Sequence, residues 1–281
     1  MVQVSVEFRK ICSKEVCALL DFLEKSIPHL QGMTGYGTIT WQPEQPSPRH
    51  YHNHYVDLLL AVYLAKHTAY TENLVNSLNR FDYLGYALNA RSIIESASTL
   101  RFYLNVKYVP AFKGGSVNLL ELLKIDDQHL RGTRFDWERF ISKEFQEMAH
   151  DVVRKITDKN KKTKIEESAK RIQNAQVNVL TCIERWALEA PVVMILYELL
   201  CEMVHPNLGS TFLVASLQDG RLSFGRRSGT PAGHNLFQTT IGWLLPVGYK
   251  EFGKLIGALA LTKYQPDELE EMGDTYKADG K

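Results

Sequence analysis

The segment from Pro191 to His205 constrains the fold most, because it is almost entirely apolar and still contains three ionisable side chains. It reads PVVMILYELLCEMVH and is followed by a Pro-Asn pair, which predicts a helix that ends at His205. Glu198, Glu202 and His205 are spaced i, i+4 and i+7, so they share one face of that helix. A helix that is apolar on most sides is usually buried, and buried ionisable groups often mark functional sites because they are costly unless paired. We therefore expect a site on this helix.

The composition is that of an ordinary soluble globular protein. Of its 281 residues, 44% are hydrophobic and 23% are charged, and the formal net charge is +1. This charge produces no global field that would attract nucleic acid or an anionic membrane, so any nucleic-acid contact needs a local basic patch. The four cysteines form no Cys-x-x-Cys pair, which favours free, reduced thiols and a cytoplasmic location.

Two features argue against export and membrane insertion. The N-terminus lacks a basic stretch followed by an apolar segment, so we expect no signal peptide. The longest apolar run, within residues 187–204, is interrupted by Glu189, Glu198 and Glu202, so we expect no membrane span.

Helical periodicity recurs along most of the chain. Apolar residues at helical spacing predict a set of helices at 4–27, 55–78, 83–107, 117–124, 136–157, 191–205 and 235–262, and one more that ends near Leu188. Residues 28–54 are rich in Gly, Pro, Gln and His, which predicts a long loop.

One segment has the period of a β-strand instead. Residues 210–217, then Gln-Asp-Gly, then residues 221–224 predict a β-hairpin near residues 210–226, because Asp-Gly is a strong turn signal. The sequence thus predicts an all-α (mainly α) protein, a multi-helix bundle forming a single helical domain over residues 1–281 with this small β-hairpin insertion. Residues 154–171 are expected to be an exposed basic segment, and residues 266–281 an acidic flexible tail.

A second helix carries a partner for the ionisable face. Arg91 and Glu95 lie one turn apart on the helix predicted at 83–107. Arginine supplies a fixed fork of donors that suits carboxylates and phosphates. We expect this helix to pack as a neighbour of 191–205, where Arg91 would meet Glu198 or Glu202 in a site shared with His205. Two structural alternatives remain: a simple i, i+4 pair of Arg91 with Glu95, or a buried polar network without chemistry.

Two blocks of sequence resemble a bacterial helical family of unknown function. They are Ala-Arg-Ser-Ile-Ile-Glu at 90–95 and Tyr-Glu-Leu-Leu-Cys-Glu-Met-Val-His-Pro at 197–206. That family pairs an Ala-Arg-Ser-Leu-x-Glu helix with a later Tyr-x-x-Leu-Ser-x-x-x-His-Pro helix. It is similar in style to the HEPN-like (higher eukaryote and prokaryote nucleotide-binding) helical proteins, some of which are RNA-cleaving toxins and defence effectors. HEPN nucleases carry Arg-x(4–6)-His on a single helix, whereas here Arg185 lies twenty residues before His205.

The resemblance implies a metal-independent endoribonuclease of a bacterial defence or toxin–antitoxin system, with its site assembled from two helices. RNA carries its own nucleophile in the 2′-hydroxyl, so the enzyme needs a base and a cation that holds the phosphorane charge. His205 suits the first role because imidazole titrates near neutral pH. Arg91 suits the second, Glu95 or Glu202 would orient one of them, and Glu198 lies on the same face. No cofactor is implied.

Two other functions fit the same residues. The first is a non-enzymatic interaction or assembly subunit of a defence complex, in which the polar residues form a structural network and the apolar helices serve an oligomer. The second is a metal-dependent, di-iron-like helical-bundle enzyme. Such bundles use two Glu-x-x-His motifs and two lone glutamates, for which this sequence offers Glu147 with His150, Glu202 with His205, and Glu72 and Glu95.

A further metal site is suggested by His50, His52 and His54. In an extended stretch these alternate residues would project to one side and bind a transition metal.

The expected partners are a second copy of the chain or another protein, with RNA as a further candidate and no membrane. Residues 154–171 contain eight Lys/Arg against three Asp/Glu, and a basic pair follows the predicted hairpin. Contacts with RNA phosphates would come from these cations, which are Lys159, Lys161, Lys162, Lys164, Arg226 and Arg227.

Overall fold

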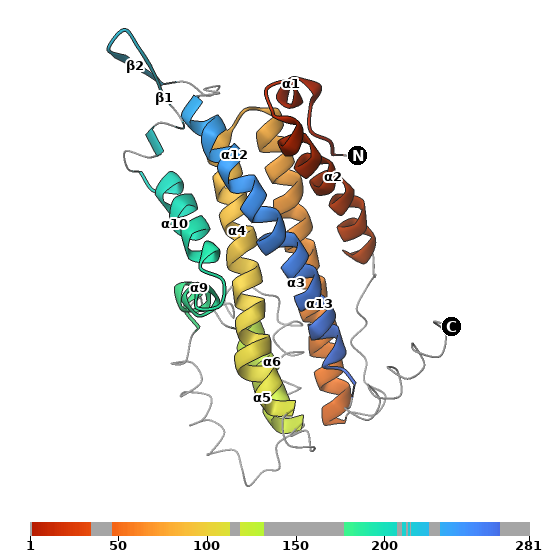
Figure 1. Cartoon of the computed structure of the whole chain (residues 1–281). Coiled ribbons are helices and arrows are strands. Elements are labelled where there is room, and N and C mark those ends of the chain that lie inside the picture. The colour runs from red at the N-terminus through yellow and green to blue at the C-terminus, as the bar shows by residue number, and fades with distance from the viewer. Residues whose placement is uncertain are drawn as a thin grey trace, which may run out of the picture. The chain divides into compact units, whose positions relative to one another are not determined.

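The computed structural model describes residues 2–34, 47–112, 119–131, 177–206, 210–211, 213, 215–224 and 231–264. These residues are mainly helical, which confirms the predicted all-α class (Figure 1). None of the helices in the described ranges has both the length and the apolar character needed to cross a bilayer. The chain divides into two compact units. Unit 1 contains residues 1–37, 60–102 and 179–257, and unit 2 contains residues 38–59, 103–178 and 258–281.

Unit 1 is mainly helical. It contains α1 (Val6–Arg9), α2 (Lys14–Thr34), α4 (Tyr83–Phe102), α9 (Val179–Ala187), α10 (Val192–Val204), α12 (Pro231–Leu245) and the π-helix η4 (Pro246–Glu251), with strands β1 (Ala215–Gln218) and β2 (Arg221–Phe224). Residues 60–79 of α3 (Pro48–Asn79) and 252–257 of α13 (Phe252–Leu261) complete it. Unit 2 contains the remaining residues of α3 and α13, with the π-helix η1 (Tyr103–Tyr108), α5 (Val109–Phe112) and α6 (Leu119–Arg131).

Helix α4 lies at the centre of unit 1, where α9, α10, α12 and η4 all pack against it (Figure 1). Its buried side includes Ala87, Ala90 and Ala97, whose small side chains let the neighbouring helices approach closely. The approach of η4 is the tightest, because a Cβ added at Gly248 would lie 2.6 Å from Cγ2 of Ile93. A Cβ at that position would require Ile93 or its surroundings to shift.

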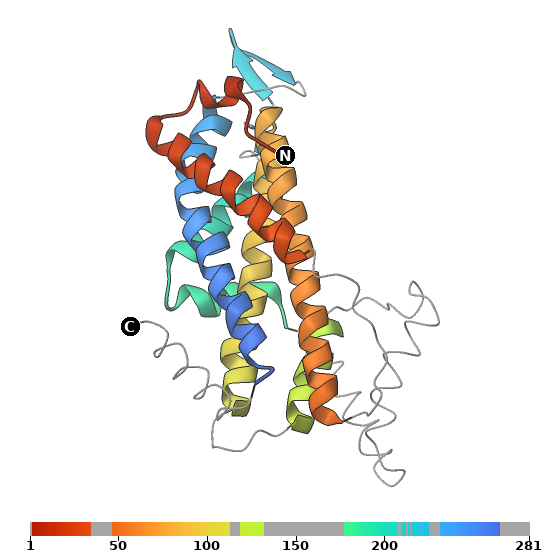
Figure 2. The same ribbon diagram turned by 90° about the vertical axis from the view of Figure 1, so that its right-hand side faces the viewer.

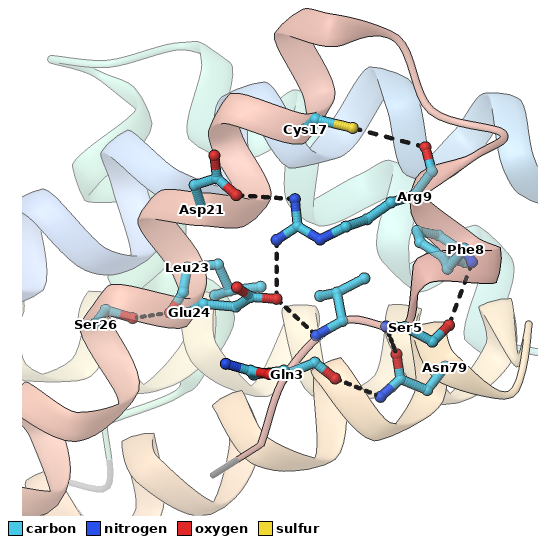
Figure 3. Close-up of polar contacts among 11 residues, drawn as sticks. Gln3, Ser5, Phe8, Arg9, Cys17, Asp21, Leu23, Glu24, Ser26 and Asn79 are labelled. Atoms are coloured by element: carbon cyan, nitrogen blue, oxygen red, sulfur yellow. Dashed lines mark hydrogen bonds and ion pairs between the residues drawn. The ribbon is translucent and has the colours of Figure 1, made fainter.

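Hydrogen bonds attach the N-terminal segment to α3 (Figure 3). The side chain of Asn79 accepts from the Ser5 N–H at 2.7 Å and donates to the Gln3 carbonyl at 2.7 Å. Ser5 also caps α1, because its hydroxyl accepts from the Phe8 N–H at 3.2 Å. Side-chain hydrogen bonds therefore satisfy backbone N–H and C=O groups of this segment.

Ion pairs attach the same segment to α2 (Figure 3). The guanidinium of Arg9 pairs with Asp21 at 2.8 Å and with Glu24 at 2.9 Å. The carboxylate of Glu24 also accepts from the Val4 N–H at 2.7 Å. Helix α2 in turn packs against α12 (Figure 2). At this contact Leu19 of α2 lies beside Gly242 of α12.

The predicted loop at 28–54 is wrong at both ends. Helix α2 continues through Pro28 to Thr34, and α3 begins at Pro48. The apolar face of α2 continues to Leu30, which is buried. Ser47 and Pro48 form the start of α3, because the Ser47 hydroxyl accepts from the His50 N–H at 3.2 Å. Residues 35–46, between the two helices, lie outside the described residues.

Other predicted helices differ from the structure at their boundaries. The helix at 4–27 is divided into α1 and α2, and Ser13 caps the second of these by accepting from the Val16 N–H. The helix at 83–107 ends as α4 and continues as η1, and α6 extends beyond the predicted 117–124. The helix at 235–262 corresponds to α12, η4 and α13, which follow one another without a break. Residues 136–157, 154–171 and 266–281 lie outside the described residues.

Strands β1 and β2 pair antiparallel, with Gln218 opposite Arg221. Asp219 and Gly220 between them have φ angles of 47° and 73°, as the two central residues of a tight hairpin turn require. The first strand is shorter than the predicted 210–217, because residues 210, 211 and 213 are helical and β1 begins at Ala215.

A histidine of unit 1 is buried among aromatic side chains. The ring of His67, on α3, is fully buried and stacks on Phe252 with the ring centroids 3.9 Å apart. Tyr249 approaches the same ring edge-on at 5.0 Å. Among the described residues, neither ring nitrogen of His67 has a hydrogen-bond partner. Burial lowers the pKa of His67 to about 3, so the imidazole stays neutral at physiological pH.

This burial predicts a loss of stability in acid. An unfolded chain binds a proton at His67 below about pH 6.5, whereas the native imidazole does not until about pH 3. The free energy of unfolding should therefore fall as the pH drops through this interval, by up to about 1.4 kcal/mol per pH unit from this group. His67→Phe keeps a stacked ring and removes the titration, so its stability should depend less on pH. Urea unfolding at pH 7.5, 6 and 5 measures the difference, with exposed His29→Phe as the control. Equal pH slopes for wild type and His67→Phe would contradict the prediction.

Candidate functional site

Helices α4 and α10 pack as neighbours, as the sequence predicts (Figure 1). At their contact, Arg91 Nε donates to Glu95 Oε1 at 2.8 Å. The Arg91 guanidinium carbon lies 5.5 Å from the ring centroid of Tyr197 on α10, a cation–π distance. The Tyr197 hydroxyl donates to the same Glu95 oxygen at 3.3 Å. These three residues form the polar cluster of the α4–α10 contact.

The cluster is half-buried and carries its charges as a pair. The side chains of Arg91 and Glu95 are 25% and 29% exposed. Burial lowers the pKa of Arg91, but the hydrogen bond and charge of Glu95 outweigh this effect and leave that pKa raised. Burial, the hydrogen bond with Cys201 and the negative charge of Glu95 raise the pKa of Tyr197 to about 12. The cluster thus holds a guanidinium, a carboxylate and a protonated phenol, and Tyr197 is the member that sequence reasoning missed. Its position on the side of α10 that carries Val193 and Leu200 was the available signal.

The other predicted site residues lie elsewhere on α10. Glu198, Glu202 and His205 share one face, but that face is exposed, so their predicted burial is wrong. The helix buries Val193, Leu196, Tyr197 and Leu200. Because these residues face the neighbouring helices, the two glutamates face outward. The ion pair of Arg91 in the structure is with Glu95 and not with Glu198 or Glu202.

His205 is the C-terminal cap residue of α10. Its backbone is extended, and its N–H donates to the Cys201 carbonyl at 3.0 Å. The imidazole is exposed, so it does not share a sheltered pocket with the Arg91 guanidinium. The cluster at the α4–α10 contact therefore matches the structural alternative, an i, i+4 pair, with a tyrosine added from the neighbouring helix.

No group of three or more potential metal ligands occurs among the described residues. Glu147 and His150 of the di-iron hypothesis lie outside them, as do the predicted RNA contacts Lys159, Lys161, Lys162, Lys164, Arg226 and Arg227. Of the lone glutamates, Glu72 accepts a hydrogen bond from Gln31 at 2.6 Å, and Glu95 belongs to the α4–α10 cluster.

The three alternating histidines are helical rather than extended, because α3 already begins at Pro48. In a helix, a spacing of two residues points side chains to different sides. His50 is exposed, whereas His52 is fully buried, so the predicted common face of His50, His52 and His54 is wrong.

In unit 2, His52 instead belongs to a buried network with Asp126 and Tyr108. Its Nδ1 lies 2.8 Å from Asp126 Oδ2, and its Nε2 lies 2.9 Å from the Thr262 carbonyl. The Tyr108 hydroxyl donates to Asp126 Oδ1 at 2.6 Å. The network connects α3, η1, α6 and the residue that follows α13. No sequence pattern marks it, because its members come from separate segments of the chain.

The pairing of His52 with Asp126 is like that of a catalytic dyad, but the nitrogen that would act on a substrate is occupied. A carbonyl can only accept, so His52 Nε2 must carry a hydrogen and donate it to Thr262. Both His52 and Asp126 are fully buried, which leaves no path for a substrate. Burial raises the pKa of Asp126, against the lowering effect of its bonds with His52 and Tyr108. The network is therefore structural.

Tyr108→Phe tests this assignment. It removes the donor to Asp126 and leaves a buried carboxyl oxygen without a partner, which should lower the free energy of unfolding by about 1–3 kcal/mol. Chemical denaturation followed by circular dichroism measures the loss. Tyr264→Phe, at an exposed tyrosine of the same unit, should change stability little. A Tyr108→Phe protein as stable as wild type would show that the network contributes nothing to unit 2.

Comparisons with protein-family models, with curated proteins and with solved structures found no match to this chain. The relation to HEPN-like proteins therefore stays a prediction, and so do the roles of His205 as base and of Arg91 as the group that holds phosphorane charge.

Proposed function

We propose that this protein is a helical binding protein without catalytic activity of its own, and that the outer surface of α10 holds a partner protein. The observation that carries the proposal is the 52% exposure of Ile195, in the middle of a helix with very few polar residues. Contiguous apolar surface on one face marks interaction sites, and Ile195 is the most exposed part of such a surface on α10.

Ile195 belongs to an apolar stripe. Val192, Leu199 and Met203 lie on the same side of α10 and are half-buried. The four residues follow at i, i+3, i+7 and i+11, the spacing with which one helix packs along another. Leu188, in the connection between α9 and α10, is 86% exposed and adds to the apolar surface of this part of unit 1.

The charge beside the stripe favours a cationic partner. Glu198 and Glu202 are exposed on α10 next to the stripe. A basic amphipathic helix would cover the apolar side chains and place Lys or Arg against the two carboxylates. A second copy of this chain, in an antiparallel α10 pair, would bring the same glutamates toward each other. We therefore assign the surface to a basic partner rather than to a homodimer.

The state of Arg91 supports a function in binding rather than catalysis. A catalytic cation has to be aimed at the position where charge develops in the transition state. The Arg91 guanidinium is instead bonded to Glu95 and stacked over Tyr197.

A peptide probe tests the α10 surface. A fluorescent 18-residue peptide of Leu and Lys, amphipathic as a helix, should bind the full chain, and Ile195→Glu should weaken binding at least about tenfold, as expected for loss of one central apolar anchor. Fluorescence anisotropy measures the affinity. Phe22→Glu is the matched control, because Phe22 on α2 has a similar exposure of 48%.

Three results would contradict this proposal. Equal binding of a Leu/Glu peptide would contradict the assigned charge of the partner, and equal loss in Phe22→Glu would contradict the location. A wild-type dimer in light scattering that Ile195→Glu dissociates would show that a second copy occupies the surface.

A HEPN-like endoribonuclease of a defence or toxin–antitoxin system is the second candidate. It is favoured by the partial exposure of Arg91 and Glu95 and by the accessible imidazole of His205, on the helix that packs against α4. Glu198 or Glu202 would then assist His205. Both candidates imply a cytoplasmic protein, in keeping with the four cysteines, which are free as predicted.

Incubation of the purified protein with RNA separates the two candidates. The binding proposal predicts that the RNA stays intact. Cleavage that falls at least about a hundredfold in both His205→Ala and Arg91→Ala, but not in exposed His29→Ala, would establish the nuclease instead.

A further inference from the structure

Unit 2 contains a cleft that the proposed function does not use. It has a volume of about 460 Å³, within the range of small-molecule sites, and lies between η1 with α5 on one side and α6 on the other. Its lining consists of Val106, Lys107, Pro110, Ala111, Glu121, Lys124, Ile125 and Gln128.

The cleft combines an apolar surface with excess positive charge. Val106, Pro110, Ala111 and Ile125 are apolar, and Ile125 is buried. Lys107 of η1 and Lys124 of α6 supply two positive charges against the single negative charge of Glu121. Neither lysine forms an ion pair with another described residue. The cleft is thus suited to a ligand with an apolar body and an anionic group.

One wall of the cleft is a π-helix. Val106 and Lys107 belong to η1, a segment of six residues with π geometry. Such segments are rare and occur frequently at functional sites, because their wider turn changes the direction of side chains relative to an α-helix. An α-helical continuation of α4 would present residues 106 and 107 at different angles.

Hydrogen bonds and a ring stack fix the two walls of the cleft to each other. The Tyr108 hydroxyl of η1 donates to Asp126 of α6 at 2.6 Å. The Tyr103 hydroxyl donates to the Gln128 carbonyl at 3.2 Å, and the Tyr103 ring stacks on His129 with the centroids 3.8 Å apart. A cleft with fixed walls needs little ordering when a ligand binds.

We propose that this cleft binds an amphipathic anion, a carboxylate with a short apolar body. The carboxylate lies toward the ammonium groups of Lys107 and Lys124, and the apolar body lies against Val106 and Ile125. A lysine ammonium acts as a compact point charge and does not require the bidentate geometry of arginine, so it suits a single carboxylate. This site is independent of the α10 surface.

Three probes of equal chain length test the charge requirement. Octanoate, octanol and octyltrimethylammonium are titrated into the full-length protein by calorimetry. Octanoate should bind saturably, octanol at least about tenfold more weakly, and the cation not at all. Comparable affinity of all three probes would overturn the role of the lysines.

Variants test the location. Lys107→Gln combined with Lys124→Gln should weaken octanoate binding at least about tenfold and leave octanol binding unchanged. Ala111→Trp fills the cleft and should abolish binding of both, while thermal unfolding shows that the variant remains folded. Lys66→Gln, at an exposed lysine of unit 1, is the matched control for the charge.

Three results of these experiments would each contradict the proposed cleft site. Absence of saturable octanoate binding, retention of binding in Ala111→Trp, or equal loss in Lys66→Gln would each overturn the proposal. Ile195→Glu should leave octanoate binding intact, so failure of the α10 surface and failure of the cleft can be told apart.

Discussion

Close packing around α4 is the constraint on which the rest of unit 1 depends. Four elements, α9, α10, α12 and η4, contact this helix, which is possible because alanines and Ser98 occupy much of its buried side. The contact between Gly248 and Ile93 leaves no room for a side chain. Because α10 must bury Val193, Leu196, Tyr197 and Leu200 against its neighbours, its orientation is decided at this contact. Tyr197 then meets Arg91, and Glu198 and Glu202 face solvent.

The polar groups that look most like catalytic residues are those that already have partners. Arg91 is committed to Glu95 and Tyr197, and His52 uses both ring nitrogens in bonds to Asp126 and Thr262. Both ring nitrogens of His52 are thereby occupied, whereas Arg91 uses only its Nε–H in the bond to Glu95. Other features remain accessible: the imidazole of His205, an apolar stripe beside two carboxylates on α10, and a cleft with excess positive charge in unit 2.

Sequence reasoning succeeded where the pattern was local and repeated. The all-α class is confirmed. The expected adjacency of α4 and α10, which is a tertiary contact and does not follow from a local pattern, is also found. It failed at helix ends, where one or two residues decide the outcome. Ser47 and Pro48 form a helix start inside a segment whose composition indicates a loop, and Ser13 divides a predicted helix in two. The face of α10 that carries Glu198, Glu202 and His205 was assigned to the interior because the helix as a whole is so apolar, whereas in the structure that face is exposed.

The positions that share a helix face follow from local spacing alone, since the α-helical repeat is the same in every protein. For that reason the spacing of Glu198, Glu202 and His205 is enough to place them on one face of α10. Which face is covered depends on neighbours far away in the chain, and only the assembled helices decide it. The same holds for the partners of buried polar groups. His52 and Asp126 are separated by 74 residues and meet because two helices pack, a contact that no spacing along the sequence encodes.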